Sequence, residues 1–322
     1  MVWRINYNIP KAEVNMNSIV SKINKLKEEK NAVILAHCYQ NVEVDEVADF
    51  VGDSLYLSKM ARDTNADIIV FAGVTFMAET AKLLSPDKKV LLPRTKSGCF
   101  MADMIDPENL RKFKSKHPGV PAVCYVNSTA AIKAECDVCC TSSNALEVVK
   151  NLDVNKVLFL PDTYLGKWIE KQLDDVEVIT YNGFCPTHLR IFPEDITKAR
   201  EQYPNAEILT HPECHTKVSE ISDFVGSTKE IMEYAARSEK KEFVIATEKG
   251  VVDRLSRDYP DKKFYLIKEN IVCQNMKWNT LEDIYNSLVN ESYEITLDET
   301  VTEKATECIN KMFGINNSRI KV

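Results

Sequence analysis

The chain has 322 residues, with a hydrophobic content of 44% and a charged content of 28%, which are ordinary values for a folded globular protein. Its formal net charge of −7 argues against a general nucleic-acid-binding surface. No apolar stretch approaches the roughly 18 residues of a membrane span, and the N-terminus lacks a signal-peptide core. We therefore expect a cytoplasmic protein without membrane or nucleic-acid partners, whose ten cysteines are thiols or metal ligands rather than disulfides.

Nine short apolar runs rich in β-branched residues recur along the chain in three sets of three. Such runs suit strands that are buried on both faces, as in parallel sheets. The segments between them carry apolar residues at helical spacing after a starting Asp, Ser or Thr, which predicts helices. The order strand, helix, strand, helix, strand indicates an α/β fold class with three three-layer α/β/α units. The predicted strands lie at 31–37, 66–73, 88–94, 120–127, 155–162, 176–183, 206–211, 241–248 and 262–270.

Each set of runs defines one predicted unit, and a helical segment flanks the units at either end. No low-complexity stretch or linker separates the units. The predicted divisions are an N-terminal helical flank at 1–30, α/β repeats at 31–115, 116–203 and 204–290, and a C-terminal helical flank at 291–322.

Three cysteines occupy the same position in the three units, because Cys99, Cys185 and Cys273 are spaced by 86 and 88 residues. Thiolates are soft ligands that hold iron–sulfur clusters, and three of them on a four-iron cluster leave one iron open to substrate. An open iron can act as a Lewis acid that helps water to leave a C–OH group. Simple duplication of a scaffold is the alternative, but duplication alone does not explain why these loop residues keep their chemical type.

Two further positions recur in the same phase, and both fall on strand or helix ends. The C-terminal ends of strands in right-handed α/β units share one edge, where ligands bind. Helix starts favour anions, although plain N-capping is the alternative for any single hydroxyl. The residues that end the first strands are His37, Tyr125 and His211, and the hydroxyl residues 17 positions later are Ser54, Ser142 and Thr228.

Polar side chains also follow two residues after each of these strand ends, at Tyr39, Asn127 and Glu213. Imidazole, phenol, amide and carboxylate groups on one edge can move protons or hold polar substrate atoms. Glu213 is the strongest candidate base, because a carboxylate is rarely placed at a buried edge without a partner or a task.

A separate group, Cys136-x-x-Cys139-Cys140, has a spacing that could bind zinc. No second Cys or His pair follows at zinc-finger spacing, so the dispersed trio is the preferred ligand set. Cys124 lies within a predicted strand and is expected to be a small buried hydrophobic residue. A zinc-stabilised scaffold without enzymatic activity stays open as an alternative.

Several longer strings between residues 37 and 277 match one protein family in the expected order. They are HCYQNVEVDEVADFVGDS, GCFMADM, CYVNSTAAIKAECDVCCTSSNA, PDTYLG, GFCPTHLRI, HPEC, VGSTKEI and ENIVCQNMK. On these motifs the chain resembles the quinolinate synthase family of bacterial and archaeal NAD biosynthesis. The resemblance covers nearly the whole chain.

The resemblance implies a transferase whose three α/β/α units are arranged with pseudo-threefold symmetry around a central site that holds a [4Fe–4S] cluster. It implies condensation of iminoaspartate (iminosuccinate) with dihydroxyacetone phosphate to quinolinate, with loss of phosphate and two waters. It also implies a functional link to an aspartate-oxidising enzyme. The implied cluster ligands are Cys99, Cys185 and Cys273.

The same resemblance implies roles for residues around the cluster. Ser54, Ser142 and Thr228, with Asn127, would fix the substrate carboxylates. Glu213 would abstract protons, with His211 and Tyr39 as proton carriers. The catalytic positions implied are Glu213, His211, Tyr39 and His37. The substrate-binding positions implied are His37, Ser54, Tyr125, Asn127, Ser142, His188, His211, Glu213 and Thr228.

The chain departs from the family pattern at two positions, because Cys38 replaces a common tyrosine and Gln274 replaces a frequent proline. Extra thiols near the predicted site are Cys136, Cys139, Cys140 and Cys214, and only Cys308 lies in the tail. A different three-cysteine iron–sulfur enzyme, such as a diphosphate reductase, is a further alternative.

Overall fold

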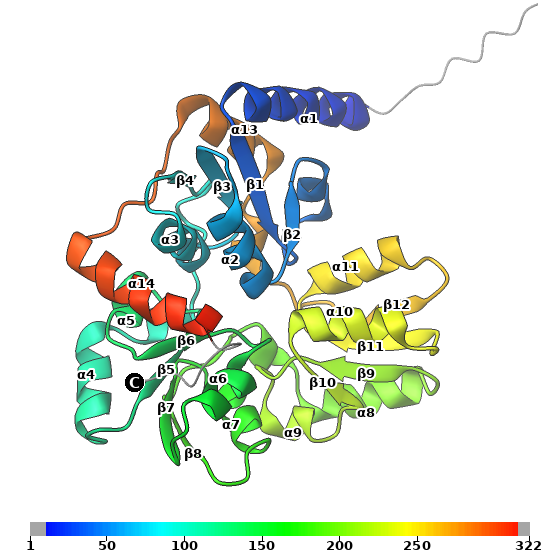
Figure 1. Ribbon diagram of the computed structural model, residues 1–322. Helices are drawn as coiled ribbons and strands as arrows, with labels where there is room; N and C mark the ends of the chain where they lie inside the picture. The colour runs from blue at the N-terminus through cyan, green and yellow to red at the C-terminus, as the bar shows by residue number, and fades with distance from the viewer. Residues whose placement is uncertain (1–10, 315–322) are drawn as a thin grey trace, which may run out of the picture.

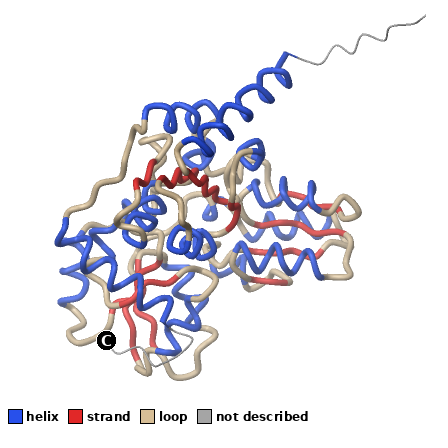
Figure 2. Tube along the Cα trace, turned by 45° about the horizontal axis from the view of Figure 1, so that its top comes forward, coloured by secondary structure: helices blue, strands red, loops and turns tan. Residues whose placement is uncertain are grey.

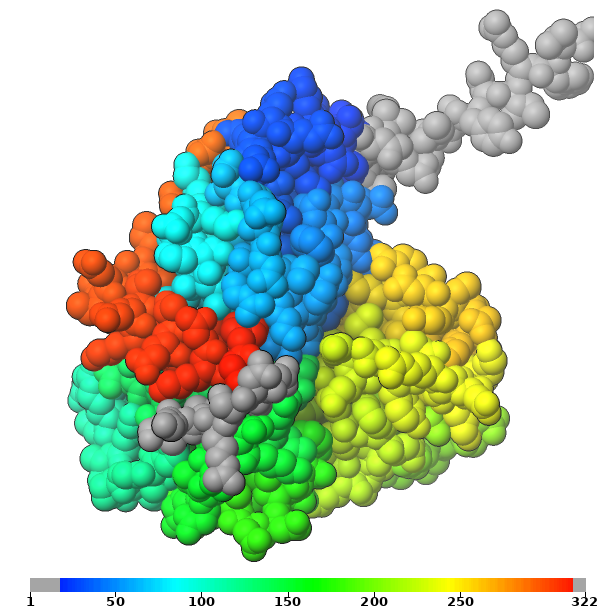
Figure 3. Space-filling model, viewed as in Figure 1, coloured from blue at the N-terminus to red at the C-terminus, as the bar shows by residue number. Residues whose placement is uncertain are grey.

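The computed structural model describes residues 11–314. Parts of both predicted helical flanks, residues 1–10 and 315–322, lie outside the described residues. The described chain forms three lobes. The sheet of each lobe comes from a run of consecutive chain, drawn in blue to cyan, green and yellow in Figure 1. Figure 3 shows the three lobes abutting one another.

Each lobe contains one four-stranded parallel sheet, with helices packed against it (Figure 2). The strand orders are β2-β1-β3-β4, β6-β5-β7-β8 and β10-β9-β11-β12, so the same order recurs in every lobe. The predicted α/β fold class is therefore confirmed. The recurring order fits a pseudo-threefold arrangement, which stays a prediction. The strands are β1 (Ala32–His37), β2 (Phe50–Gly52), β3 (Ile68–Ala72), β4 (Lys89–Leu91), β5 (Ala122–Tyr125), β6 (Val138–Cys140), β7 (Lys156–Leu160), β8 (Glu177–Thr180), β9 (Glu207–Thr210), β10 (Phe224–Val225), β11 (Glu242–Ala246) and β12 (Lys263–Leu266).

The sequence predicted three strands per unit, and the structure adds a fourth. The additional strands β2, β6 and β10 have two or three residues each, too few for an apolar run to stand out. Each pairs with the first strand of its lobe, as in the register His37↔Gly52. The pairing places the hydroxyl loop beside the end of the first strand, which brings the two recurring positions together.

The helices follow the predicted pattern between strands, and several begin at Asp, Ser or Thr caps. Buried apolar residues of the strands pack against the inner faces of the helices. Every residue of β3, for example, is buried. The helices are α1 (Lys11–Glu29), η1 (Val42–Glu46), α2 (Ser54–Asp63), α3 (Thr75–Leu84), η2 (Ala102–Met104), α4 (Pro107–Ser115), α5 (Ala130–Lys133), α6 (Ala145–Asn151), α7 (Thr163–Glu170), η3 (His188–Arg190), α8 (Pro193–Gln202), α9 (Thr216–Ser219), α10 (Thr228–Arg237), α11 (Lys249–Asp258), α12 (Gln274–Lys277), α13 (Leu281–Asn290) and α14 (Glu299–Phe313).

The terminal helices pack on the first and second lobes. α13 packs on α1 and on β3, where Ile284 and Leu288 join the apolar cluster of the first sheet. α14 lies across α3, α5 and β6 and buries Cys308 and Ile309 there (Figure 1). α13 thus lies in the range 204–290 yet packs on the first lobe, and the unit boundaries stay a prediction. Among the described helices, none has the length and apolar character of a membrane span.

The third lobe is joined to the first through the start of α11. Gly250 lies so close to the first lobe that a Cβ there would be 2.6 Å from the carbonyl oxygen of Cys38. Arg254, 1% exposed, donates to the carbonyl oxygens of Cys38 and Gln40 at 2.7 and 3.0 Å and pairs with Asp45 at 2.5 Å. A buried guanidinium thus connects the third lobe to the residues that follow β1 in the first lobe.

Candidate active site

One cavity is lined by residues of all three lobes. Its volume is about 90 Å³, several times the roughly 10–15 Å³ that one water needs. Every residue that the sequence nominated for the site lies on its wall. They are His37, Tyr39, Ser54, Cys99, Tyr125, Asn127, Ser142, Cys185, His188, His211, Glu213, Thr228 and Cys273.

The three recurring cysteines occupy loops that follow the last strand of each sheet, and each is partly buried. Burial raises the pKa of Cys99 to about 12, and the charge of Cys273 raises it further. Burial also raises the pKa of Cys185, with further increases from Glu213, Cys273 and Cys99. The three thiols therefore act on one another electrostatically, and a thiophilic metal would have to displace their protons.

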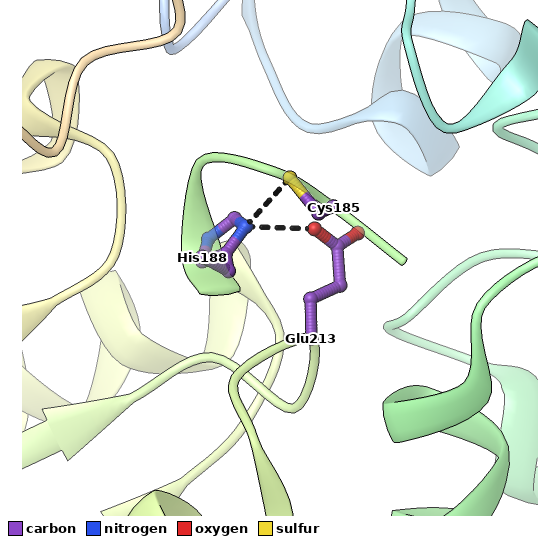
Figure 4. Close-up of side chains that lie close together, drawn as sticks. All are labelled: Cys185, His188 and Glu213. Atoms are coloured by element: carbon purple, nitrogen blue, oxygen red, sulfur yellow. Dashed lines mark hydrogen bonds and ion pairs between the residues drawn. The ribbon is translucent and has the colours of Figure 1, made fainter. Parts of the chain in front are cut away.

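His188 links Cys185 to Glu213 (Figure 4). Its Nδ1 lies 3.1 Å from the Cys185 sulfur and 2.8 Å from Oε2 of Glu213. The potential ligand atoms of Cys185, His188 and Glu213 all lie within 4.8 Å of one another. In the described part of the chain, no other group of three or more His, Cys, Asp or Glu residues is this close. Thiolate, imidazole and carboxylate at this separation can also hold a single cation.

Glu213 is buried but well supplied with partners. Tyr125 donates its hydroxyl proton to Oε1 of Glu213 at 2.7 Å. Burial alone would raise the pKa of Glu213, but His188, with His211 and Tyr125, outweighs it and holds the pKa below its ordinary value. The carboxylate is therefore ionised and able to accept a proton.

His37 and His211 are oriented in the same way in two different lobes. Nδ1 of His37 accepts from the backbone N–H of Tyr39 at 3.1 Å, and Nδ1 of His211 accepts from that of Glu213 at 3.3 Å. Burial lowers the pKa of each ring to about 3. Both rings are thus neutral and carry their proton on Nε2, which makes them hydrogen-bond donors.

Two of the predicted hydroxyl residues begin helices, and neighbouring residues provide the caps. Asp53 caps α2 by accepting from the N–H of Tyr56, and Ser227 caps α10 by accepting from that of Glu230. Ser54 and Thr228 are therefore not required as caps, which removes the capping alternative for both. Ser142 lies in the turn before α6, whose cap position is Asn144.

Asn127 carries an unused acceptor beside these residues. Its Oδ1 is buried and has no hydrogen-bond partner among the described residues, although buried polar atoms are normally paired. A substrate N–H or O–H in the cavity would satisfy it.

The structure adds residues that the sequence did not nominate. Glu248, fully buried, caps α11, accepts from the backbone N–H of Cys273 at 3.2 Å and pairs with Lys277 at 3.2 Å. Lys277 also donates to the carbonyl oxygen of Tyr39 at 2.6 Å. The pair therefore holds the Cys273 loop against the first lobe. The sequence offered one signal for Glu248, which is its position. It caps the helix after β11, as Asp162 caps α7 after β7 in the second lobe.

The alternative zinc group does not assemble as proposed. Cys139 and Cys140 are successive residues of β6, so their side chains point to opposite faces of the sheet. Cys139 is instead in register with Cys124 on β5, and both are buried in the core, as expected for Cys124. Cys38 is likewise buried and does not line the cavity.

Comparison with known proteins decides the family. The sequence profile of the family described as quinolinate synthetase A protein matches residues 21–314. The chain belongs to the quinolinate synthetase A family. It is 51% identical over 302 residues to a quinolinate synthase of Alkaliphilus metalliredigens, covering 94% of this chain and 100% of that protein.

Other relatives agree with this family. A quinolinate synthase of Caldicellulosiruptor saccharolyticus is 49% identical over 94% of this chain and 100% of its own length. Quinolinate synthase 2 of Methanosarcina acetivorans is 50% identical over 93% of this chain and 96% of its own. The predicted resemblance is confirmed, and membership gives no support to the diphosphate reductase alternative.

Proposed function

We propose that the protein is a cytoplasmic quinolinate synthase of NAD biosynthesis, which condenses iminoaspartate with dihydroxyacetone phosphate. One C–C bond and one C–N bond form the pyridine ring, and phosphate and two waters leave. The observation that carries the proposal is the convergence of residues from three lobes on one cavity. An aspartate-oxidising enzyme is the expected source of iminoaspartate.

The donor set fits a [4Fe–4S] cluster. Cys99, Cys185 and Cys273 each come from a different lobe and line the same cavity, where the charge of Cys273 raises the pKa of the other two thiols. Three soft ligands leave one iron without a protein ligand. When bound, such a cluster supplies a Lewis acid that polarises a C–O bond so that water can leave.

Substrate carboxylates would bind at the hydroxyl residues. Ser54 and Thr228 begin α2 and α10, ten-residue helices whose N-terminal N–H groups favour anions. Ser142 from the second lobe faces the same cavity. The unpaired Oδ1 of Asn127 would accept from the nitrogen or a hydroxyl group of the substrate.

Glu213 is the group best placed to remove protons while the ring forms. It is ionised, buried and held by Tyr125 and His188. The neutral His37 and His211 rings would donate from Nε2 to substrate oxygens. Tyr39 would exchange protons with this set. Burial also limits loss of protons to bulk water.

A single cation on Cys185, His188 and Glu213 is a competing use of the same atoms. It leaves Cys99 and Cys273 without a function, whereas a cluster uses all three thiols. The two possibilities predict different metals and different sensitivities to substitution, so metal analysis separates them.

The test is iron and sulfide analysis of anaerobically purified protein, with quinolinate formation measured on the same sample. We expect about four irons and four sulfides per chain. Cys99→Ser should lose iron and activity together, while the control Cys308→Ala, on the buried face of α14, should keep both. One zinc per chain that survives Cys99→Ser, or full activity without iron, would overturn the proposal.

A further inference from the structure

A second hollow adjoins the loops that carry the three recurring cysteines. It is a groove of about 580 Å³, far larger than the cavity of the candidate active site. Cys273 lines both the groove and the cavity, so the two hollows share a wall. The groove also contains chain neighbours of all three cysteines, which are Phe100 in the first lobe, Phe184 and Pro186 in the second, and Val272 and Gln274 in the third.

The wall of the groove is mostly apolar, although the groove is open to solvent. Phe100 is 65% exposed, the highest value for a large apolar side chain among the described residues. Met104 and Phe184 extend the same wall, and the backbone N–H of Phe184 lies 3.4 Å from the Met104 sulfur. Apolar surface that stays in water beside functional loops is typical of a contact site for another molecule.

Two exposed charged residues, Asp103 and Arg190, line the groove as well. Neither forms an ion pair with another described residue, and the Arg190 guanidinium donates only to the carbonyl oxygen of Asn270, at 3.3 Å. Apolar surface with unpaired charges of both signs resembles a protein–protein interface, whose apolar centre has a polar rim. A site for a small anion would not include an unpaired carboxylate. The groove therefore fits a protein partner with complementary charges.

The position of the groove indicates what this partner carries. Iron–sulfur clusters are held by thiolates, so a preformed cluster travels to an acceptor on the thiolates of another protein. Such a protein must bring its cluster close to the acceptor thiols. Among the described cysteines, Cys273 is the one on the groove wall, and it is therefore the thiol that a docked partner meets first.

We propose that the groove is the docking surface for an iron–sulfur carrier protein, which hands a preformed [4Fe–4S] cluster to Cys99, Cys185 and Cys273. The inference rests on the cluster of the proposed function. The transfer is an exchange of thiolate ligands. At each of three irons, one bond to a carrier sulfur breaks, one bond to a cysteine of this chain forms, and the proton of that cysteine passes to the released carrier thiolate. No electron moves, so the exchange needs neither an oxidant nor a reductant.

The first test measures cluster loading of the metal-free full-length protein under anaerobic conditions. One arm uses a purified scaffold protein loaded with a [4Fe–4S] cluster, and the other uses ferrous iron and sulfide alone. Phe100→Ser should slow loading from the scaffold about 10-fold, as expected when an interface anchor is truncated, and leave loading from free ions unchanged. The matched control is Phe192→Ser, because Phe192 is 52% exposed but lies outside the groove. Wild-type loading of Phe100→Ser from the scaffold, equal slowing in both arms, or equal slowing in Phe192→Ser overturns the proposal.

The second test measures docking itself. Hydrogen exchange of the metal-free protein with the loaded scaffold should show slower exchange at 98–104, 184–190 and 272–275. Arg190→Glu should weaken this protection, whereas the control Arg237→Glu, 80% exposed on α10 and outside the groove, should not. Protection elsewhere only, or equal effects of the two variants, contradicts the proposal.

A second copy of this chain is the other occupant that the groove could take. Light scattering that shows a dimer of the wild type and a monomer of Phe100→Ser would assign the groove to self-association and overturn the proposal. A failure of the proposed function gives a different result, because the wild type would then take up no cluster from either source.

Discussion

The first and third lobes end their first strands with the same local structure but different chemistry. In both, a histidine at the strand end accepts from the backbone N–H two residues later. That later residue is Tyr39 in the first lobe and Glu213 in the third. Both histidines are neutral because burial lowers their pKa to about 3.

The comparison separates what the repeated scaffold provides from what each lobe adds. In the first and third lobes, a backbone N–H holds a histidine ring in the same tautomer, with its proton on Nε2. The residue two positions later determines whether the lobe offers a phenol or a carboxylate. The second lobe has Tyr125 and Asn127 at the matching positions, and the hydroxyl of Tyr125 donates a hydrogen bond directly to Glu213. Three copies of one fold unit thus supply a phenol, an amide and a carboxylate to the same cavity.

The largest effect should come from removing the charge that distinguishes the third lobe. Glu213→Gln keeps the size of the side chain but cannot accept a proton as a base. General-base catalysis contributes roughly 10²–10⁴-fold, so quinolinate formation should fall by about that factor. Iron content measured alongside should stay at the wild-type value, and a fully active variant would remove Glu213 from this role.

The contact between the two lobes can be broken at Arg254. Arg254→Met leaves buried carbonyls without their donor and removes one partner of Asp45, which should lower the free energy of unfolding by about 3–5 kcal/mol. The control is Arg257→Met, whose half-exposed side chain pairs with the same Asp45 and should change stability by less than about 1 kcal/mol. Urea unfolding measures both variants, and equal effects would contradict the view that the buried Arg254 contacts hold the first and third lobes together.

The phenol of the first lobe should matter less than the carboxylate of the third. Tyr39→Phe removes the hydroxyl that contacts Thr228 and Thr247 but leaves the backbone N–H that orients His37. The loss of these two hydrogen bonds, each worth roughly 0.5–1.5 kcal/mol, predicts a roughly 10-fold fall in kcat. A loss as large as that of Glu213→Gln would mean that the two lobes contribute equally to proton transfer.

The smallest effect concerns a brace that belongs to the first lobe. Lys30 and Lys89 lower the pKa of Glu291, which follows α13, to about 2. Its contribution to stability is therefore present above pH about 4.5 and is lost as pH falls toward about 2. Glu291→Gln should lower the melting temperature slightly near pH 7, and the difference from wild type should shrink on acidification. A difference that grows at low pH would contradict this sign.

The longer strands and the recurring site positions could be predicted because both repeat. Runs such as 66–73 carry enough apolar residues to indicate buried strands, and β3 forms within that range. The edge strand β10 has two residues and leaves no such pattern. It forms because it pairs with β9, and the sequence of the segment alone does not show that this partner lies beside it.

The supporting residues of the site could not be predicted for a similar reason. Thr247 and Glu248 act on Tyr39, His188 and Cys273, which come from distant parts of the sequence. Threonine and glutamate after a strand are common and carry no spacing signal. Only the packing of the lobes shows which rings and loops they reach.

The placement of one thiol in each lobe has a consequence for biosynthesis. A nascent chain that has emerged only as far as the second lobe presents Cys99 and Cys185 but not Cys273, so under the proposed function it offers an incomplete set of sulfurs. Cofactor insertion would then follow the end of translation and depend on all three lobes having docked. A truncated or misassembled chain would stay without iron, which makes metal content a direct report of correct folding.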